Sequence, residues 1–103
     1  MKTLKDCFGH SLRLTDEQLA HILDHPEMKG LEAEIERVIQ RPQLVRRSRS
    51  DAAVRLFYEF YARTIVDGKW LCDVVKYVEN DAFIATAYLT DKPKAGEDLW
   101  PKK

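Results

Sequence analysis

The spacing of the apolar residues changes once along this chain, at about Pro42. Upstream of that proline, apolar residues recur with the period of an α-helix: Leu31, Ile35, Val38 and Ile39 fall at positions i, i+4, i+7 and i+8. Downstream, β-branched and aromatic residues dominate, and apolar positions recur about every second residue, as they do in strands. This order predicts an α+β fold in which helices precede a sheet.

The first residues are expected to form a short β-hairpin, because Gly9 supplies the backbone freedom that a tight turn needs. Thr15 can cap the first helix, and Asp16 and Glu17 then lie where the helix dipole favours acids. Pro26 ends that helix, since proline lacks an N–H donor and clashes with the preceding turn. A second helix is predicted over residues 31–40. A four-stranded antiparallel sheet follows, with strands expected over residues 44–50, 53–66, 69–78 and 82–90.

Two turn signals give an expected register for the sheet. Asp67-Gly68 is a strong signal for a two-residue hairpin turn, and Asn80-Asp81 is a weaker one. Turns at both places would put Tyr58 opposite Tyr77, on a face rich in hydroxyl groups, while the more apolar face would pack under the helices. The first face is expected to hold Tyr58, Phe60, Tyr77, Thr86 and Tyr88, and the second Trp70, Cys72, Val74, Phe83, Ala85, Ala87 and Leu89.

The length and charge of the chain limit what it can do. Its 103 residues predict a single domain over residues 1–103, with a tail from about residue 92 that is flexible unless Leu99 and Trp100 dock on the body. Seventeen basic residues balance seventeen acidic ones, so the net charge attracts no polyanion. Any site for nucleic acid must therefore come from local segregation of charge.

The chain carries no signal for export or membrane insertion. No apolar run approaches the ~20 residues that span a bilayer, and the first ten residues do not resemble a signal peptide. Cys7 and Cys72 are far apart and lack a CxxC partner, which favours reduced thiols over a disulfide framework or a cysteine zinc site. A cytoplasmic protein is expected.

The strongest local charge lies between Arg37 and Arg49, in a stretch that is rich in arginine and contains no acid. Arg46, Arg47 and Arg49 fall on the first predicted strand, with Arg47 and Arg49 on one of its faces. One interpretation is a solvated edge strand, protected from aggregation by its charges. The other is a phosphate-binding strand, because the planar guanidinium group suits phosphate and nearby tyrosines can stack on unpaired bases.

His21 is the candidate for proton transfer. It lies opposite the apolar stripe of the first predicted helix, with Glu17 one turn earlier, and imidazole groups titrate near neutrality. A solvent-exposed helical histidine without a chemical role is the alternative. Together with Asp24 and His25, His21 also matches the H-x-x-D-H spacing of some zinc sites. Pro26 closes the helix at the second histidine, so no metal is expected.

The order of these segments resembles a known group of ribonucleases. A helix with a histidine (LTDEQLAHILDHPEM), a second helix ending in proline, an Arg/Ser strand and the hairpin KWLCDVVKYVENDAFIATAYLTDK occur in this sequence. In this order the chain resembles small bacterial and phage proteins of the barnase–EndoU–colicin–RelE-like ribonuclease superfamily, especially those related to the BrnT toxin. The resemblance covers nearly the whole chain, and LAHIL, VVKY and IATAY are its most specific parts.

The resemblance implies a RelE- or barnase-like fold and metal-independent cleavage of RNA through attack of the 2′-hydroxyl. Matched position by position, it places the catalytic residues at His21, Arg47, Lys76 and Thr86. It also implies a toxin of a toxin–antitoxin pair or a phage-derived nuclease. Residues expected to bind RNA are Arg46, Arg49, Tyr58, Tyr77 and Tyr88.

The expected partners are RNA (tRNA or mRNA) and an antitoxin protein, with no cofactor, no membrane and no DNA. Asp73 departs from this pattern, because it puts a carboxylate into a stretch expected to be apolar and would oppose RNA binding beside a phosphate site. A non-catalytic module that binds RNA or a protein is the alternative, since tyrosine and arginine are the residues that interaction patches favour.

Overall fold

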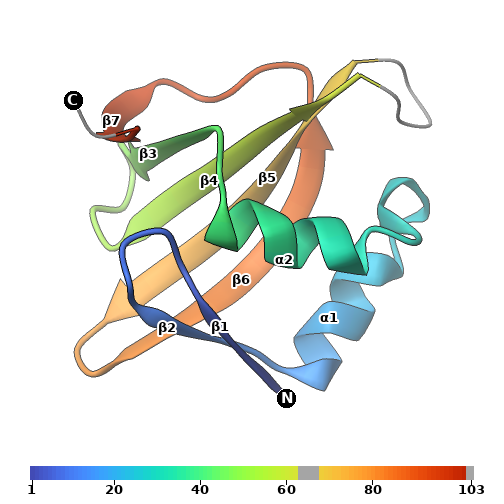
Figure 1. Ribbon diagram of the computed structural model, residues 1–103, viewed down its shortest axis with the longest axis horizontal. Helices are drawn as coiled ribbons and strands as arrows, with labels where there is room; N and C mark the ends of the chain where they lie inside the picture. The colour runs from blue at the N-terminus through green and yellow to red at the C-terminus, as the bar shows by residue number, and fades with distance from the viewer. Residues whose placement is uncertain (63–67, 102–103) are drawn as a thin grey trace.

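The computed structural model describes residues 1–62 and 68–101. Within these residues, the strands form one mixed, mostly antiparallel, seven-stranded sheet in the order β1-β2-β6-β5-β4-β3-β7, and the helices lie on one side of it (Figure 1). The predicted α+β class is confirmed, although the sheet has three strands more than the four expected. The elements are β1 (Lys2–Lys5), β2 (Ser11–Leu14), α1 (Asp16–Leu23), the 3-10 helix η1 (Pro26–Met28), α2 (Glu32–Gln40), β3 (Leu44–Ser48), β4 (Val54–Tyr61), β5 (Lys69–Val78), β6 (Asp81–Thr90) and β7 (Gly96–Trp100).

The N-terminal hairpin and the two helices form as the sequence predicts. Gly9 has a φ of 89° in the hairpin turn, and the Thr15 side chain accepts a hydrogen bond from the Gln18 N–H to cap α1. Ile22 of α1 and Ile35 of α2 are buried in the same core, against the sheet. No helix among the described residues is long and apolar enough to cross a membrane.

Strands β4 and β5 pair antiparallel, as predicted, but in a different register. Tyr58 lies opposite Cys72, so its predicted pairing with Tyr77 is wrong. The pair at the end of this ladder is Tyr61 with Lys69, which makes the connection longer than the two residues predicted; Asp67 itself lies outside the described residues. The apolar pattern does not select a register here, because both faces of this hairpin carry apolar side chains.

Strands β5 and β6 also pair antiparallel, with a turn one residue earlier than predicted. The turn falls on residues 79–80, and Asn80 takes the positive φ of 60°, which asparagine tolerates well. A β-bulge at Ala85 then changes the pairing again and places Thr86 opposite Val74. The two-residue turn expected at Asn80-Asp81 would pair Thr86 with Val75, so that predicted pairing is wrong by one position.

These shifts decide which side chains face the helices, since a one-residue change of register moves a side chain to the other face. Four residues that were predicted on the core face lie on the other face instead: Trp70, Cys72, Val74 and Phe83. Ala87 and Leu89 do pack on the helix side, as predicted. Tyr77 was predicted on the face rich in hydroxyl groups, and it lies on the helix side. The helix-side face carries Val45, Phe57, Leu71, Asp73, Val75, Tyr77, Ile84, Ala87 and Leu89, and the other, here called the open face, carries Leu56, Tyr58, Phe60, Trp70, Cys72, Val74, Thr86 and Tyr88.

Strand β3 is not at the edge of the sheet. It lies between β4 and β7, so the interpretation of its arginines as a solvated edge is wrong. Strand β7 comes from the predicted tail, and its Leu99 and Trp100 pack against the core, which confirms that these two residues dock. Only glycine fits at position 96, because a Cβ there would lie 2.3 Å from the carbonyl oxygen of Arg47.

Asp73 is buried in the core on the helix-side face. Its side chain is 0% exposed, and neither carboxyl oxygen has a hydrogen-bond partner among the described residues. Burial raises the pKa of this carboxyl well above its usual value, because the charged form loses its hydration. Burial thus favours the uncharged form of Asp73 and keeps its side chain inside the core, away from the open face, so it does not lie beside an anion site there.

We expect Asp73→Asn to stabilise the protein at high pH and to have little effect near the pKa of an unfolded carboxyl. Because the folded pKa is raised, the folded state binds more protons between the two pKa values, and wild-type stability falls as pH rises through that window. The expected gain in unfolding free energy is at least about 1 kcal/mol at about pH 8, and close to zero at about pH 4. Urea denaturation across this range measures it.

Glu79→Gln, at an exposed acid in the β5–β6 turn, is the matched control and should leave the pH dependence of stability unchanged. Identical pH profiles for wild type and Asp73→Asn would show that this carboxyl is not buried.

Candidate functional site

The residues predicted to act on RNA do not come together in one cluster. His21 is exposed on α1 and lines a shallow pocket of its own with Glu17, Ala20 and Asp24. That pocket holds two carboxylates and no arginine or lysine. It therefore lacks the positive charge that a phosphate needs, and the surroundings of His21 give its predicted catalytic role no support.

The first two arginines of the run are neutralised by the C-terminal strand. The Arg46 Nε donates to Asp98 Oδ1 across 2.7 Å, and the Arg47 Nη1 donates to Glu97 Oε1 across 2.9 Å. Both acids lie in β7, which pairs antiparallel with β3 and places Asp98 opposite Arg46 and Glu97 opposite Arg47. The sequence GEDLW shows that two acids are present, but nothing in the sequence indicates that this segment pairs with β3.

Arg49 has different surroundings. It lies in a bend after β3 and lines a cavity of about 430 Å³ on the open face, which we call the Arg49 pocket. Lys94 lines the same pocket, and among the described residues neither cation has a carboxylate within ion-pair distance. The carboxylate of Asp51 also lines it, but lies 3.4 Å from the Lys76 ammonium. The remaining lining residues are Ser48, Ser50, Val54, Leu56, Val74, Thr86, Tyr88 and Ala95.

Two of the predicted tyrosines flank a buried thiol on the open face. Tyr58 is 0% exposed, and its hydroxyl oxygen accepts a hydrogen bond of 3.1 Å from the Lys94 N–H, so it offers no free ring for stacking. Burial raises the pKa of the Cys72 thiol to about 12, and it raises the pKa of the Tyr88 hydroxyl as well. Tyr88 is partly exposed and lines the Arg49 pocket, as does Thr86.

A second cavity, of about 570 Å³, lies between the β1–β2 turn and the end of the β5–β6 hairpin. We call it the His10 pocket; its lining includes Ser11, Arg13, Arg55, Tyr77 and Asp81 beside His10. Strand β2 meets β6 at the single register pair of Arg13 with Phe83. The turn of the β1–β2 hairpin lies in front of the sheet in Figure 1.

The carboxylate of Asp6 organises the His10 pocket. Its Oδ1 accepts the backbone N–H groups of Phe8 (2.9 Å) and His10 (2.8 Å), and its Oδ2 accepts the Tyr77 hydroxyl (2.6 Å). The same Oδ2 lies 3.3 Å from the His10 Nδ1. The Asp6 side chain is 0% exposed, whereas that of His10 is 52% exposed. Burial, and then the hydrogen bond with Asp6, raise the pKa of Tyr77.

Arg55 is held in this pocket by aromatic rings. Its guanidinium carbon lies 4.5 Å from the centre of the Tyr77 ring and 4.9 Å from that of Phe8, both distances of cation–π contacts. The rings of His10 and Tyr77 are 5.5 Å apart. Sequence reasoning missed this group. The Asp-x-x-x-His spacing around Gly9 was a signal for an Asx-type turn, but the approach of Arg55 and Tyr77 was not readable from the chain.

No group of three or more His, Cys, Asp or Glu side chains that could hold a metal ion occurs in residues 1–62 and 68–101. Comparison with known proteins gives no match: no protein-family model, no curated protein and no solved structure is significantly similar to this chain.

We expect Gly96→Ala to weaken the pairing of β7 with β3. The added Cβ would overlap the carbonyl oxygen of Arg47, and overpacking of this kind costs about 1 to 3 kcal/mol. Urea denaturation should show the loss of stability, and hydrogen exchange of the β7 amides should become faster. Ala95→Ser, at the exposed neighbouring position, is the control. Unchanged exchange in Gly96→Ala would contradict the close approach of the two strands.

Proposed function

We propose that this protein binds single-stranded RNA at the Arg49 pocket and acts as a metal-independent endoribonuclease. The observation that carries the proposal is the pair of cations at this pocket, Arg49 and Lys94, which have no carboxylate partner in the described part of the chain. Arg46 and Arg47, which precede Arg49 in the sequence, are both neutralised. Unpaired cations attract phosphate without first having to give up an ion pair.

The rest of the Arg49 pocket suits the other parts of a nucleotide. Val54, Leu56 and Val74 give it an apolar floor, on which the flat face of a base can lie. The hydroxyls of Ser48 and Ser50 lie 3.1 Å apart at the rim and can bond to phosphate or sugar oxygens. Single-stranded RNA is favoured, because its bases are free to leave the stack.

Aromatic side chains extend this surface along the open face. Phe60 is 42% exposed, and its ring lies 5.4 Å from that of Trp70 in an edge-to-face contact. Stacking of a base on such rings contributes about 1 to 3 kcal/mol in single-strand binding proteins. Tyr88 lines the Arg49 pocket itself. A strand of RNA can thus meet cations at one end of the open face and aromatic rings at the other.

Cleavage is proposed to follow the route that the ribonuclease resemblance implies. The 2′-hydroxyl of the substrate attacks the adjacent phosphorus, so the protein has to supply positive charge and proton transfer. The order of a hairpin, two helices and consecutive antiparallel strands is consistent with the RelE- or barnase-like arrangement expected. A toxin role, with an antitoxin that covers the active surface, remains part of this proposal.

A non-catalytic module is the alternative. The exposed Phe60 and the partly exposed Trp70 are large aromatic side chains of the kind that protein interfaces favour. On this alternative the open face binds RNA or a protein and no phosphodiester bond is broken. Incubation of the purified protein with total RNA in EDTA separates the two, because only the ribonuclease leaves 2′,3′-cyclic phosphate ends.

We expect Arg49→Gln to weaken the binding of a fluorescently labelled single-stranded RNA, measured by anisotropy over a series of salt concentrations. Loss of one phosphate contact should lower the slope of log affinity against log salt by about one. Arg41→Gln is the matched control, since it removes the same charge from an exposed arginine after α2, outside the pocket.

Equal effects of the two substitutions would mean that Arg49 contributes only to the general charge of the protein. Absence of RNA binding by the wild-type protein would contradict the proposed function itself.

A further inference from the structure

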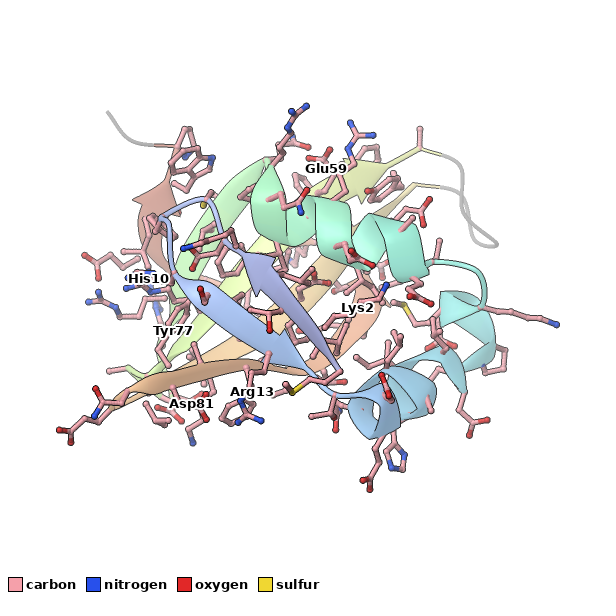
Figure 2. The ribbon with its side chains drawn as sticks, turned by 60° about the horizontal axis from the view of Figure 1, so that its bottom comes forward. Lys2, His10, Arg13, Glu59, Tyr77 and Asp81 are labelled. Carbon is pink, nitrogen blue, oxygen red and sulfur yellow. The ribbon has the colours of Figure 1, made fainter. Side chains whose placement is uncertain are left out.

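We propose that the His10 pocket is the site at which the phosphodiester bond is broken, with His10 as the general base and Arg55 as the cation for the phosphate. This deepens the proposed function and rests on it for the class of substrate, a phosphodiester with a neighbouring 2′-hydroxyl. Figure 2 shows His10 and Tyr77 beside one another at one end of the sheet, with Arg13 and Asp81 nearby. None of His10, Arg13 and Arg55 belongs to the residues that the ribonuclease resemblance implies.

The contact with Asp6 prepares His10 to accept a proton. With Nδ1 protonated, the imidazole donates to Oδ2 of Asp6 across 3.3 Å, so Nε2 keeps its lone pair. The carboxylate is fully buried, while half of the imidazole is exposed at the pocket. A buried carboxylate that fixes the orientation of an imidazole is an arrangement by which proteins build a general base.

Arg55 supplies the positive charge for the phosphate. It has no carboxylate within ion-pair distance in the described part of the chain, in contrast to Arg13, whose Nη2 lies 2.6 Å from Asp81. The rings of Phe8 and Tyr77 hold the Arg55 guanidinium group from their faces. Its N–H donors make no hydrogen bond within the described residues, so they can bind oxygen ligands. Tyr77 contacts both Arg55 and His10, so the base and the cation lie around one ring.

The reaction that this arrangement supports is transesterification of RNA. Nε2 of His10 takes the proton of the 2′-hydroxyl, and the resulting oxygen forms a bond to the adjacent phosphorus. The bond from phosphorus to the 5′ oxygen breaks, and that oxygen takes a proton from water. The protonated His10 then gives its proton to the hydroxide that remains and returns to its neutral form. Arg55 neutralises the charge that grows on the phosphoryl oxygens. The products are a 2′,3′-cyclic phosphate and a 5′-hydroxyl.

The two pockets are close enough in the fold to serve one RNA strand. Val54 lines the Arg49 pocket and Arg55 lines the His10 pocket, and as consecutive residues of β4 they point to opposite faces. The β1–β2, β3–β4 and β5–β6 turns gather at the same end of the sheet (Figure 1). RNA that passes around the β3–β4 turn can thus contact both pockets.

The test is cleavage of a dinucleotide and of a longer single-stranded oligonucleotide in EDTA, with the cyclic phosphate product detected by chromatography. His10→Gln should lower the cleavage rate by roughly 10² to 10⁴-fold. Arg55→Lys keeps the charge but loses the fork of donors and the ring contacts, so its rate should also fall, by roughly 10-fold or more. His25→Gln is the matched control, because His25 is an exposed histidine outside the pocket. Melting temperature and RNA affinity are measured for each variant.

The expected result is loss of cleavage in the His10 and Arg55 variants with RNA affinity retained, and no cleavage of the 2′-deoxy dinucleotide. Wild-type protein that binds RNA but cleaves neither substrate would overturn this inference and leave the proposed RNA binding intact. Cleavage by His10→Gln at the wild-type rate, or an equal loss in His25→Gln, would overturn it as well. Weaker RNA binding by Arg49→Gln, with dinucleotide cleavage unchanged, would support the inference, because the bond would then be broken outside the Arg49 pocket.

Discussion

The β-bulge at Ala85 is the constraint on which the distribution of side chains over the sheet depends. Ile84 and Ala87 lie before and after the bulge, and both face the helices. Residues three apart in a regular strand point to opposite faces, so both could not do so without the bulge. The extra residue therefore keeps both ends of β6 in the core. The bulge is also attached to a helix, because the Ala85 carbonyl accepts a hydrogen bond from the side-chain amide of Gln18 in α1. One irregularity thus fixes the register and docks α1 on β6.

Charge compensation determines where on this sheet an anion can bind. The chain has no net charge, and its arginine-rich strand is largely neutralised by the acids of β7. At the two pockets, the cations without a carboxylate within ion-pair distance among the described residues are Arg49 and Lys94 on the open face and Arg55 on the helix side, all near one end of the sheet. A neutral protein can bind a polyanion locally in this way, with a modest salt dependence set by few contacts.

The sequence predicted the fold class and most of the elements, but it did not predict which side chains the sheet brings together. Helical periodicity, the Thr15 cap and Pro26 are local signals, and each is borne out. The register of the sheet is not local. Turn residues suggested it, but the longer β4–β5 connection moved Tyr77 to the helix side, and the bulge in β6 moved Phe83 away from it. The acid that neutralises Arg46 and the aromatic rings that hold Arg55 come from distant segments, so no spacing along the chain could reveal them.

The central claim is that RNA meets this protein at the end of the sheet where the two pockets open. Titration of isotope-labelled wild-type protein with a short single-stranded RNA, followed by amide chemical shifts, tests it most directly. The account predicts the largest changes around Ser48–Ser50 and Lys94, with a second group around His10 and Arg55. Changes concentrated on α1 around His21, or none at all, would contradict it.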